Sequence, residues 1–182
     1  WIEELLNDAR SKGTEISCDR YPYIASATDL DIILPNWVYE GGVTEERKKL
    51  KDPLTRERIV KDMVQGTERP GFWESIMISS VFNEKKKQYE GMTVAEIAKT
   101  LKMPPLEFVL DLLCEEECKV SALFFSMSEE NLDKILNWDF VMIGSDSSLR
   151  STTGILNYGK PHPRCYGTFS RVIRKYVNEK KI

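Results

Sequence analysis

The order of apolar and polar positions along the chain predicts helices that alternate with short strands. Residues 1–11 place apolar side chains on one helical stripe, and Gly13 follows as a C-cap. Thr93 and Glu96 form the start signal of another helix, and Pro104 interrupts the pattern after it. The helices predicted beyond the first cover residues 44–50, 53–65, 93–101, 106–117, 128–136 and 168–180. Strands are predicted at the β-rich runs 14–18, 75–81, 122–125 and 140–143.

The segment 29–71 differs from its surroundings. Its first part, residues 29–38, is apolar and broken at Pro35, and a turn follows at 40–42. The two helices expected after that turn are polar over most of their length. We interpret 29–71 as a solvated helical insertion. Residues 83–91 and 147–163 are expected to be loops.

Strands that alternate with helices predict an α/β fold with parallel strands. Polar residues follow two of the strands: Asp19–Tyr21 come after the first, and Asp146 comes after 140–143. In parallel α/β folds, ligands and catalytic groups gather at that end of the strands. A complete eight-stranded barrel needs roughly 250 residues. The chain has 182 residues and too few strands, so it could form the last part of a barrel.

Composition and charge exclude several classes of partner. Hydrophobic residues make up 41% and charged residues 30% of the chain, as in a soluble globular domain. The net charge is -3, so nucleic acid is not an expected partner. The chain has no apolar run of about 18 residues, and we expect no signal peptide and no membrane partner. The charge clusters at 45–49 and 84–87 are interpreted as solvated surface.

Cysteine and histidine usage argues against a metal site built by this chain alone. The four cysteines include no CxxC pair, and Cys114 and Cys118 would share one face of a helix. His162 is the only histidine, and structural zinc usually takes four ligands. We expect reduced thiols and a cytoplasmic location. The chain begins at Trp1 without a methionine, and we expect it to be a piece of a longer protein.

Four stretches, in order, resemble the N-acyl-D-amino-acid deacylases (D-aminoacylases) of the amidohydrolase superfamily. The first is the run CDRYPYIAS at 18–26, followed by ILPNW at 33–37. The others are FSMSEE at 125–130, MIGSD at 142–146 and HPRCYGTFSRV at 162–172. The resemblance extends from Ile16 to about Val177.

This resemblance implies a partial (β/α) barrel of the metal-dependent hydrolase kind. Residues 1–182 would be one fragment of a single catalytic domain, with 29–71 as an insertion in it. The family binds zinc mainly through histidines and a cysteine on earlier barrel strands, which would lie upstream of Trp1. We therefore expect zinc in the full-length parent but none bound to this fragment, and we expect the fragment alone to be inactive.

The resemblance also assigns roles to particular residues. Asp146 matches the catalytic aspartate, which would take a proton from zinc-bound water and pass it to the leaving amine. Tyr21 matches the tyrosine that holds the substrate carboxylate. A serine often shares this role six residues further on, where this chain has Ala27; Ser26 or Thr28 could substitute. A turn cap at Asp146 and a packed aromatic ring at Tyr21 are the structural alternatives.

Four further residues are candidates for substrate binding. Phe124 and Met127 match residues that line the pocket for the apolar side chain of the substrate, with core packing as the alternative. His162 and Arg164 follow the catalytic strand, where arginine could clamp a carboxylate and histidine could hydrogen-bond. Both could equally anchor a loop.

The function implied is hydrolysis of the amide bond of N-acyl-D-amino acids, giving a carboxylate and a free D-amino acid. A cyclic-amide hydrolase of the dihydroorotase or hydantoinase kind is one alternative. A non-catalytic binding module, with 29–71 as its partner surface, is the other. The open sheet edges of a barrel fragment also predict self-association.

Overall fold

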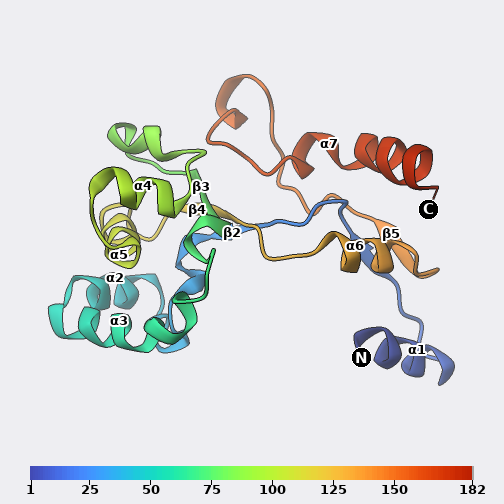
Figure 1. The fold of residues 1–182 in the computed structure, drawn as a ribbon, viewed down its shortest axis with the longest axis horizontal. Coiled ribbons are helices and arrows are strands. Elements are labelled where there is room, and N and C mark those ends of the chain that lie inside the picture. The colour runs from blue at the N-terminus through green and yellow to red at the C-terminus, as the bar shows by residue number, and fades with distance from the viewer. Residues whose placement is uncertain (182) are drawn as a thin grey trace. The chain divides into compact units, whose positions relative to one another are not determined.

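The computed structural model describes residues 1–181, which divide into two compact units (Figure 1). Unit 1 contains residues 1–24, 127–150 and 163–181. Unit 2 contains residues 25–126 and 151–162. The chain therefore crosses between the units several times, and segments distant in sequence make up each of them.

Unit 1 is built on a pair of parallel strands. β1 (Cys18–Arg20) pairs with β5 (Val141–Ile143) in the register Cys18↔Val141 and Arg20↔Ile143. Because the strands are parallel and in this register, the segments that follow them leave from the same end of the pair. The helices of unit 1 are α1 (Ile2–Ser11), α6 (Glu129–Leu136), α7 (Arg164–Arg171) and the π-helical continuation η6 (Val172–Lys180).

Unit 2 contains an antiparallel sheet in the order β2-β4-β3. Phe124 at the end of the central strand lies opposite Ser26 on one side and Ile76 on the other. The strands are β2 (Ser26–Asp29), β3 (Ile76–Ser80) and β4 (Ser121–Phe124). The α-helices are α2 (Val43–Lys51), α3 (Pro53–Thr67), α4 (Val94–Leu101) and α5 (Pro105–Glu115). Short helical turns cover η1 (Leu30–Ile33), η2 (Asn36–Val38), η3 (Trp73–Ser75), η4 (Glu84–Tyr89) and η5 (Gly154–Leu156).

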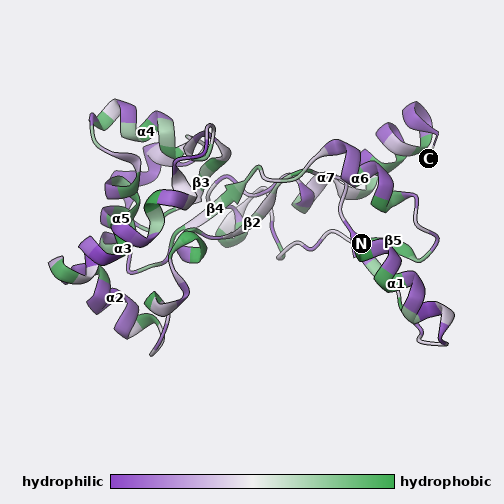
Figure 2. Ribbon diagram, turned by 60° about the horizontal axis from the view of Figure 1, so that its bottom comes forward, coloured by the Kyte–Doolittle hydropathy of each residue, from purple (hydrophilic) through white to green (hydrophobic). Residues whose placement is uncertain are grey.

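The main hydrophobic core lies in unit 2. α5 provides much of it, because its apolar residues occupy more than one helical face; Val109, Leu110 and Leu113 have no exposed surface. Ile78 of β3 and Ala122 of β4 are equally buried in the same cluster. Figure 2 shows apolar and polar stretches alternating along the helices, as expected where one side packs and the other meets solvent.

The helices were predicted more accurately than the strands. The first strand lies at Cys18–Arg20, later than the predicted 14–18, and β2 was not predicted at all. The expectation of parallel strands holds for β1 and β5 but is wrong for β2, β3 and β4, which are antiparallel. β2 has the sequence Ser-Ala-Thr-Asp, which carries no apolar alternation, so its pairing with β4 alone makes it a strand.

The helices within 29–71 are amphipathic rather than polar throughout. Leu50 of α2 and Ile59 and Met63 of α3 are buried in the unit 2 core, as are Leu30 and Val38 ahead of them. The few apolar positions of these helices therefore contribute to the core, although most of their surface is polar. Whether 29–71 is an insertion relative to the family remains an expectation.

Three local predictions are corrected by the structure. Residues 84–89 form a helical turn inside the predicted loop, and the last helix begins at Arg164 rather than near residue 168. α5 ends at Glu115, and Cys118 adopts a left-handed conformation with φ of +61°, so Cys114 and Cys118 do not share a helix face. All four cysteines are free thiols. Among residues 1–181, no helix has the length and apolar character to cross a membrane.

Candidate active site at the ends of β1 and β5

An ion pair between Asp146 and Arg164 lies beyond the end of β5. Arg164 Nη1 is 2.9 Å from Asp146 Oδ2. Asp146 follows β5 by three residues and adopts a left-handed φ of +49°, an uncommon conformation that aspartate tolerates better than most residues. The Arg164 side chain is 10% exposed, whereas that of Asp146 is 72% exposed. The arginine is thus a nearly buried anchor, and the carboxylate remains accessible to solvent.

Tyr21 lies beside the same arginine. It directly follows β1 and is only 8% exposed. The Arg164 guanidinium carbon is 4.8 Å from the centroid of its ring, and that of Arg20 is 4.5 Å from the same centroid. Both distances are within the range of cation–π attraction. The parallel pairing of β1 with β5 thus brings together three of the predicted site residues: Tyr21, Asp146 and Arg164.

Met127 joins this cluster through Arg20, which sequence reasoning did not single out. Arg20 Nη2 donates to Met127 Sδ at 2.8 Å and to the carbonyl of Tyr23 at 3.0 Å. Met127 N also donates to the carbonyl of Ile24 at 3.2 Å. Arg20 therefore joins the Tyr21–Tyr23 segment to Met127. Arg20 is the last residue of β1, and its separation from Met127 by 107 positions in the sequence left no local sign of this contact.

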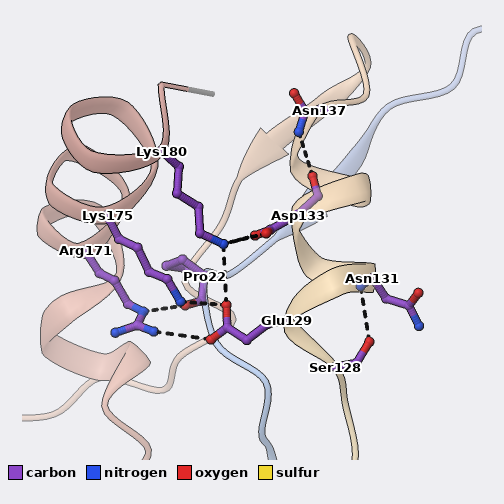
Figure 3. Close-up of polar contacts among 9 residues, drawn as sticks. All are labelled: Pro22, Ser128, Glu129, Asn131, Asp133, Asn137, Arg171, Lys175 and Lys180. Carbon is purple, nitrogen blue, oxygen red and sulfur yellow. Dashed lines mark hydrogen bonds and ion pairs between the residues drawn. The ribbon is translucent and has the colours of Figure 1, made fainter.

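A charged network holds the segment after β1 (Figure 3). Arg171 Nε donates to the carbonyl of Pro22 at 2.7 Å, and Arg171 Nη2 lies 3.8 Å from Glu129. Lys175 donates to the other oxygen of Glu129 at 2.6 Å, and Lys180 bridges Glu129 at 3.9 Å and Asp133 at 2.5 Å. Two carboxylates of α6 thus pair with three cations of α7 and its continuation η6. One of these cations, Arg171, also binds the Pro22 carbonyl.

An open cleft of about 530 Å³ lies along this helix. Arg171, Arg174 and Lys175 line it together with Tyr23. Burial raises the pKa of the Tyr23 phenol, an effect that the nearby Arg171 partly offsets. Tyr21, Asp146 and Arg164 are not among the residues that line this cleft, so it does not define the candidate active site.

Phe124 and His162 belong to unit 2. Phe124 is half-buried and packs against the main core, which agrees with the structural alternative for this residue. His162 is 3% exposed, and its Nε2 lies 3.0 Å from the carbonyl oxygen of Ala25. This contact anchors the end of the 151–162 segment to the start of β2. The substrate-binding roles of Phe124 and His162 remain predictions.

The described residues do not fit a zinc centre of their own. Within residues 1–181, no three histidine, cysteine or acidic side chains are placed so that they could hold a metal ion. Asp146 is paired with the cation Arg164, and the single histidine contacts a backbone carbonyl. A zinc ion near Asp146 would therefore need its other ligands from outside these residues.

The fold is similar to that of solved deacylase structures. No family model matches the chain. A solved structure, N-acyl-D-glutamate deacylase from Bordetella bronchiseptica with zinc and a phosphonate mimic of the tetrahedral intermediate, matches with a TM-score of 0.64 and 23% identity. The match covers 98% of this chain and 27% of that one. A D-aminoacylase structure described as defining a novel subset of amidohydrolases matches with a TM-score of 0.57 and 23% identity, over 97% of this chain and 27% of that one.

Two curated sequences that match the chain also carry deacylase names. The chain is 25% identical over 177 residues to the N-acyl-D-glutamate deacylase of Alcaligenes xylosoxydans xylosoxydans, covering 97% of this chain and 26% of the relative. A D-aminoacylase of the same organism is 38% identical over 58 residues, which are 32% of this chain and 10% of the relative. The resemblance to N-acyl-D-amino-acid deacylases is thereby confirmed. The chain spans about a quarter of the length of the deacylases it matches.

Proposed function

We propose that this chain is part of a zinc-dependent hydrolase that cleaves the amide bond of N-acyl-D-amino acids. The products would be a carboxylate and a free D-amino acid. The observation that carries the proposal is the accessible Asp146 carboxylate beside Arg164 and Tyr21, at the end of two paired parallel strands. The similarity to deacylases over 97% of the chain supports it.

Asp146 is the proposed proton carrier. Its side chain is exposed, so one carboxylate oxygen can approach a substrate while the other contacts Arg164. Such a group takes a proton from the attacking water and delivers it to the departing amine nitrogen. Zinc held by residues outside this chain would supply the acidified water for the attack.

Arg164 and Tyr21 are the proposed contacts for the substrate carboxylate. A guanidinium presents a planar fork of donors that suits a carboxylate, and Arg164 is held in place by burial and by the Tyr21 ring. An incoming carboxylate would share or replace Asp146 as its partner. Met127 is proposed to contact the rest of the substrate, and the roles of Phe124 and His162 stay predictions from the family resemblance.

The proposed architecture is a partial (β/α) barrel, in which β1 and β5 are two neighbouring barrel strands. Within the described residues, each of these strands has only the other as a partner. The free strand edges support the expectation that the isolated chain self-associates. We further propose a cytoplasmic location and no nucleic-acid partner.

The test is a substrate panel on a longer protein that contains this chain, supplied with zinc. Amine release would be followed from matched N-acetyl-D- and N-acetyl-L-amino acids, with a hydantoin and dihydroorotate alongside. D-selective release supports the proposal. Turnover of the cyclic amides alone would replace it with a cyclic-amide hydrolase.

The isolated chain supplies a separate measurement. Because residues 1–181 do not form a zinc centre of their own, we expect no turnover from the isolated chain at any zinc concentration. Zinc-dependent turnover by the pure chain would contradict this part of the proposal. If the longer protein turned over nothing, a binding module would become the better interpretation.

A further inference from the structure

A buried acidic pair lies in unit 2, away from the residues proposed for catalysis. Glu46 of α2 is 2% exposed although it is an ionisable residue. Its electrostatic neighbours include the carboxyl group of Asp31 from η1 and the thiol of Cys118 after α5. Two neighbouring carboxylates cannot both ionise without repulsion, so one shared proton is the favourable state.

The unshared oxygen of Glu46 makes the charged form especially costly. Glu46 Oε1 is fully buried and has no hydrogen-bond partner. An unpaired buried charge is far more expensive than an unpaired neutral carbonyl oxygen, which is what this atom becomes when the proton is on the other oxygen. The geometry therefore favours a protonated Glu46 in the folded protein.

The cations nearest to the pair are engaged elsewhere. Lys49, one turn along α2, donates to the carbonyls of Trp37, Val38 and Glu40 at 2.8, 3.0 and 2.7 Å. Arg47 points to Glu117, with Nη2 2.8 Å from the carboxylate oxygen. Burial and the charge of Asp31 raise the pKa of Glu46. Lys49 lowers this pKa, but its effect is smaller than either of those.

The other groups that face the pair add negative or neutral character. Tyr39 donates its hydroxyl to the carbonyl of Asp31, and burial raises the pKa of that phenol. Burial likewise raises the pKa of Cys118 to about 12, so the thiol stays neutral. Asp29 and burial raise the pKa of Asp31 itself. No metal can replace the proton, because no three suitable ligands converge anywhere in residues 1–181.

We propose that Asp31 and Glu46 form a proton-operated latch, in which one shared proton holds α2 against η1 and Cys118 and loss of that proton loosens α2. Both pKa values are raised in the folded state, so folding binds a proton that the unfolded chain lacks. The latch is fully closed below the ordinary carboxyl pKa. It weakens as the pH rises through the raised value, and the opening equilibrium of α2 increases about tenfold per pH unit in between.

Two measurements on the full chain test the latch. The first is the infrared carbonyl band of a protonated carboxylic acid, which should persist above the ordinary carboxyl pKa as the pH is raised. The second is amide exchange of α2 between about pH 5 and about pH 9, corrected for the intrinsic pH dependence of exchange. We expect the band in the wild type and its loss in Glu46→Gln, which mimics the protonated group. We also expect the protection of α2 to fall with pH in the wild type but to stay constant in Glu46→Gln.

Matched controls separate the latch from general effects of pH. Glu45→Gln removes the adjacent, half-exposed carboxylate of α2 and should leave both the band and the pH profile unchanged. Peptides from α6 in unit 1 provide an internal reference. If Glu46→Gln folds poorly, Asp31→Asn serves instead: it removes the neighbouring charge and should reduce the pH dependence, while the burial of Glu46 keeps part of it. A wild-type spectrum without the band, or parallel pH profiles for the wild type and both variants, would overturn the proposal.

Discussion

Arg164, nearly buried, holds the exposed carboxylate of Asp146 at 2.9 Å while its guanidinium lies over the ring of Tyr21. Because β1 and β5 are parallel and adjacent, the residues that follow them meet at this arginine, which comes from the start of α7. A group that contacts both neighbours can transmit a change at one of them to the other. Substitutions at Asp146 and at Arg164 separate the contributions of these two residues.

Asp146→Asn should abolish most of the hydrolase activity proposed for the longer protein. The amide cannot carry the proton, and removing a general acid–base group costs about 10²–10⁴-fold in kcat. Steady-state kinetics on an N-acetyl-D-amino acid measures this. Asp139→Asn is the control, since that carboxylate is 83% exposed and forms only a 3.8 Å pair with Arg10. Equal activity of the two variants would remove Asp146 from the mechanism.

Arg164→Lys should weaken substrate binding more than it slows the chemical step. Lysine keeps the charge but loses the planar fork, and a hydrogen bond to a charged group contributes about 1.5–3 kcal/mol. We expect KM to rise at least about tenfold with a smaller change in kcat. Arg174→Lys, at an 85% exposed side chain paired with Glu179, is the control. A fall in kcat at constant KM would instead indicate that Arg164 acts through Asp146.

Leu110→Ala should strongly destabilise unit 2. Leu110 is fully buried within α5, and truncating such a leucine costs about 2–5 kcal/mol in the free energy of unfolding. Urea denaturation of the chain measures the loss. Leu54→Ala at the start of α3 removes the same atoms from a residue that is 76% exposed, and should change the stability by less than about 0.5 kcal/mol. Similar losses in both variants would contradict the assigned core.

Gly159→Ala should destabilise the chain more than Gly154→Ala. Both glycines have positive φ, +65° and +71°, so both substitutions incur backbone strain. Only at Gly159 would the new Cβ clash, at 2.6 Å from Ser80 Cβ and 2.7 Å from the carbonyl oxygen of Ser79, whereas Gly154 has open space. Thermal unfolding of both variants measures the difference. An equal loss would mean that the 151–162 segment does not pack on β3 as described.

Local sequence signals determined the parts of this protein that rest on short-range interactions. The helix beginning at Thr93 follows from its capping box, in which Thr93 and Glu96 satisfy each other's backbone donors, as the structure confirms. The apolar run 140–143 marked β5, and the same reading placed Asp146 just beyond its end. The four matched stretches were sufficient to identify the deacylase resemblance.

Only the tertiary structure decided which distant residues meet and which faces are buried. β2 is a strand because β4 offers it hydrogen bonds, and its own residues give no sign of this. Arg20 reaches Met127 across 107 positions, and Arg164 pairs with Asp146, a contact that the sequence did not indicate. Glu46 has an ordinary place in a charged helix, yet packing removes it from water. Helix caps and apolar periods act within a few residues, whereas pairing, burial and charge compensation depend on neighbours that the chain supplies only once it has folded.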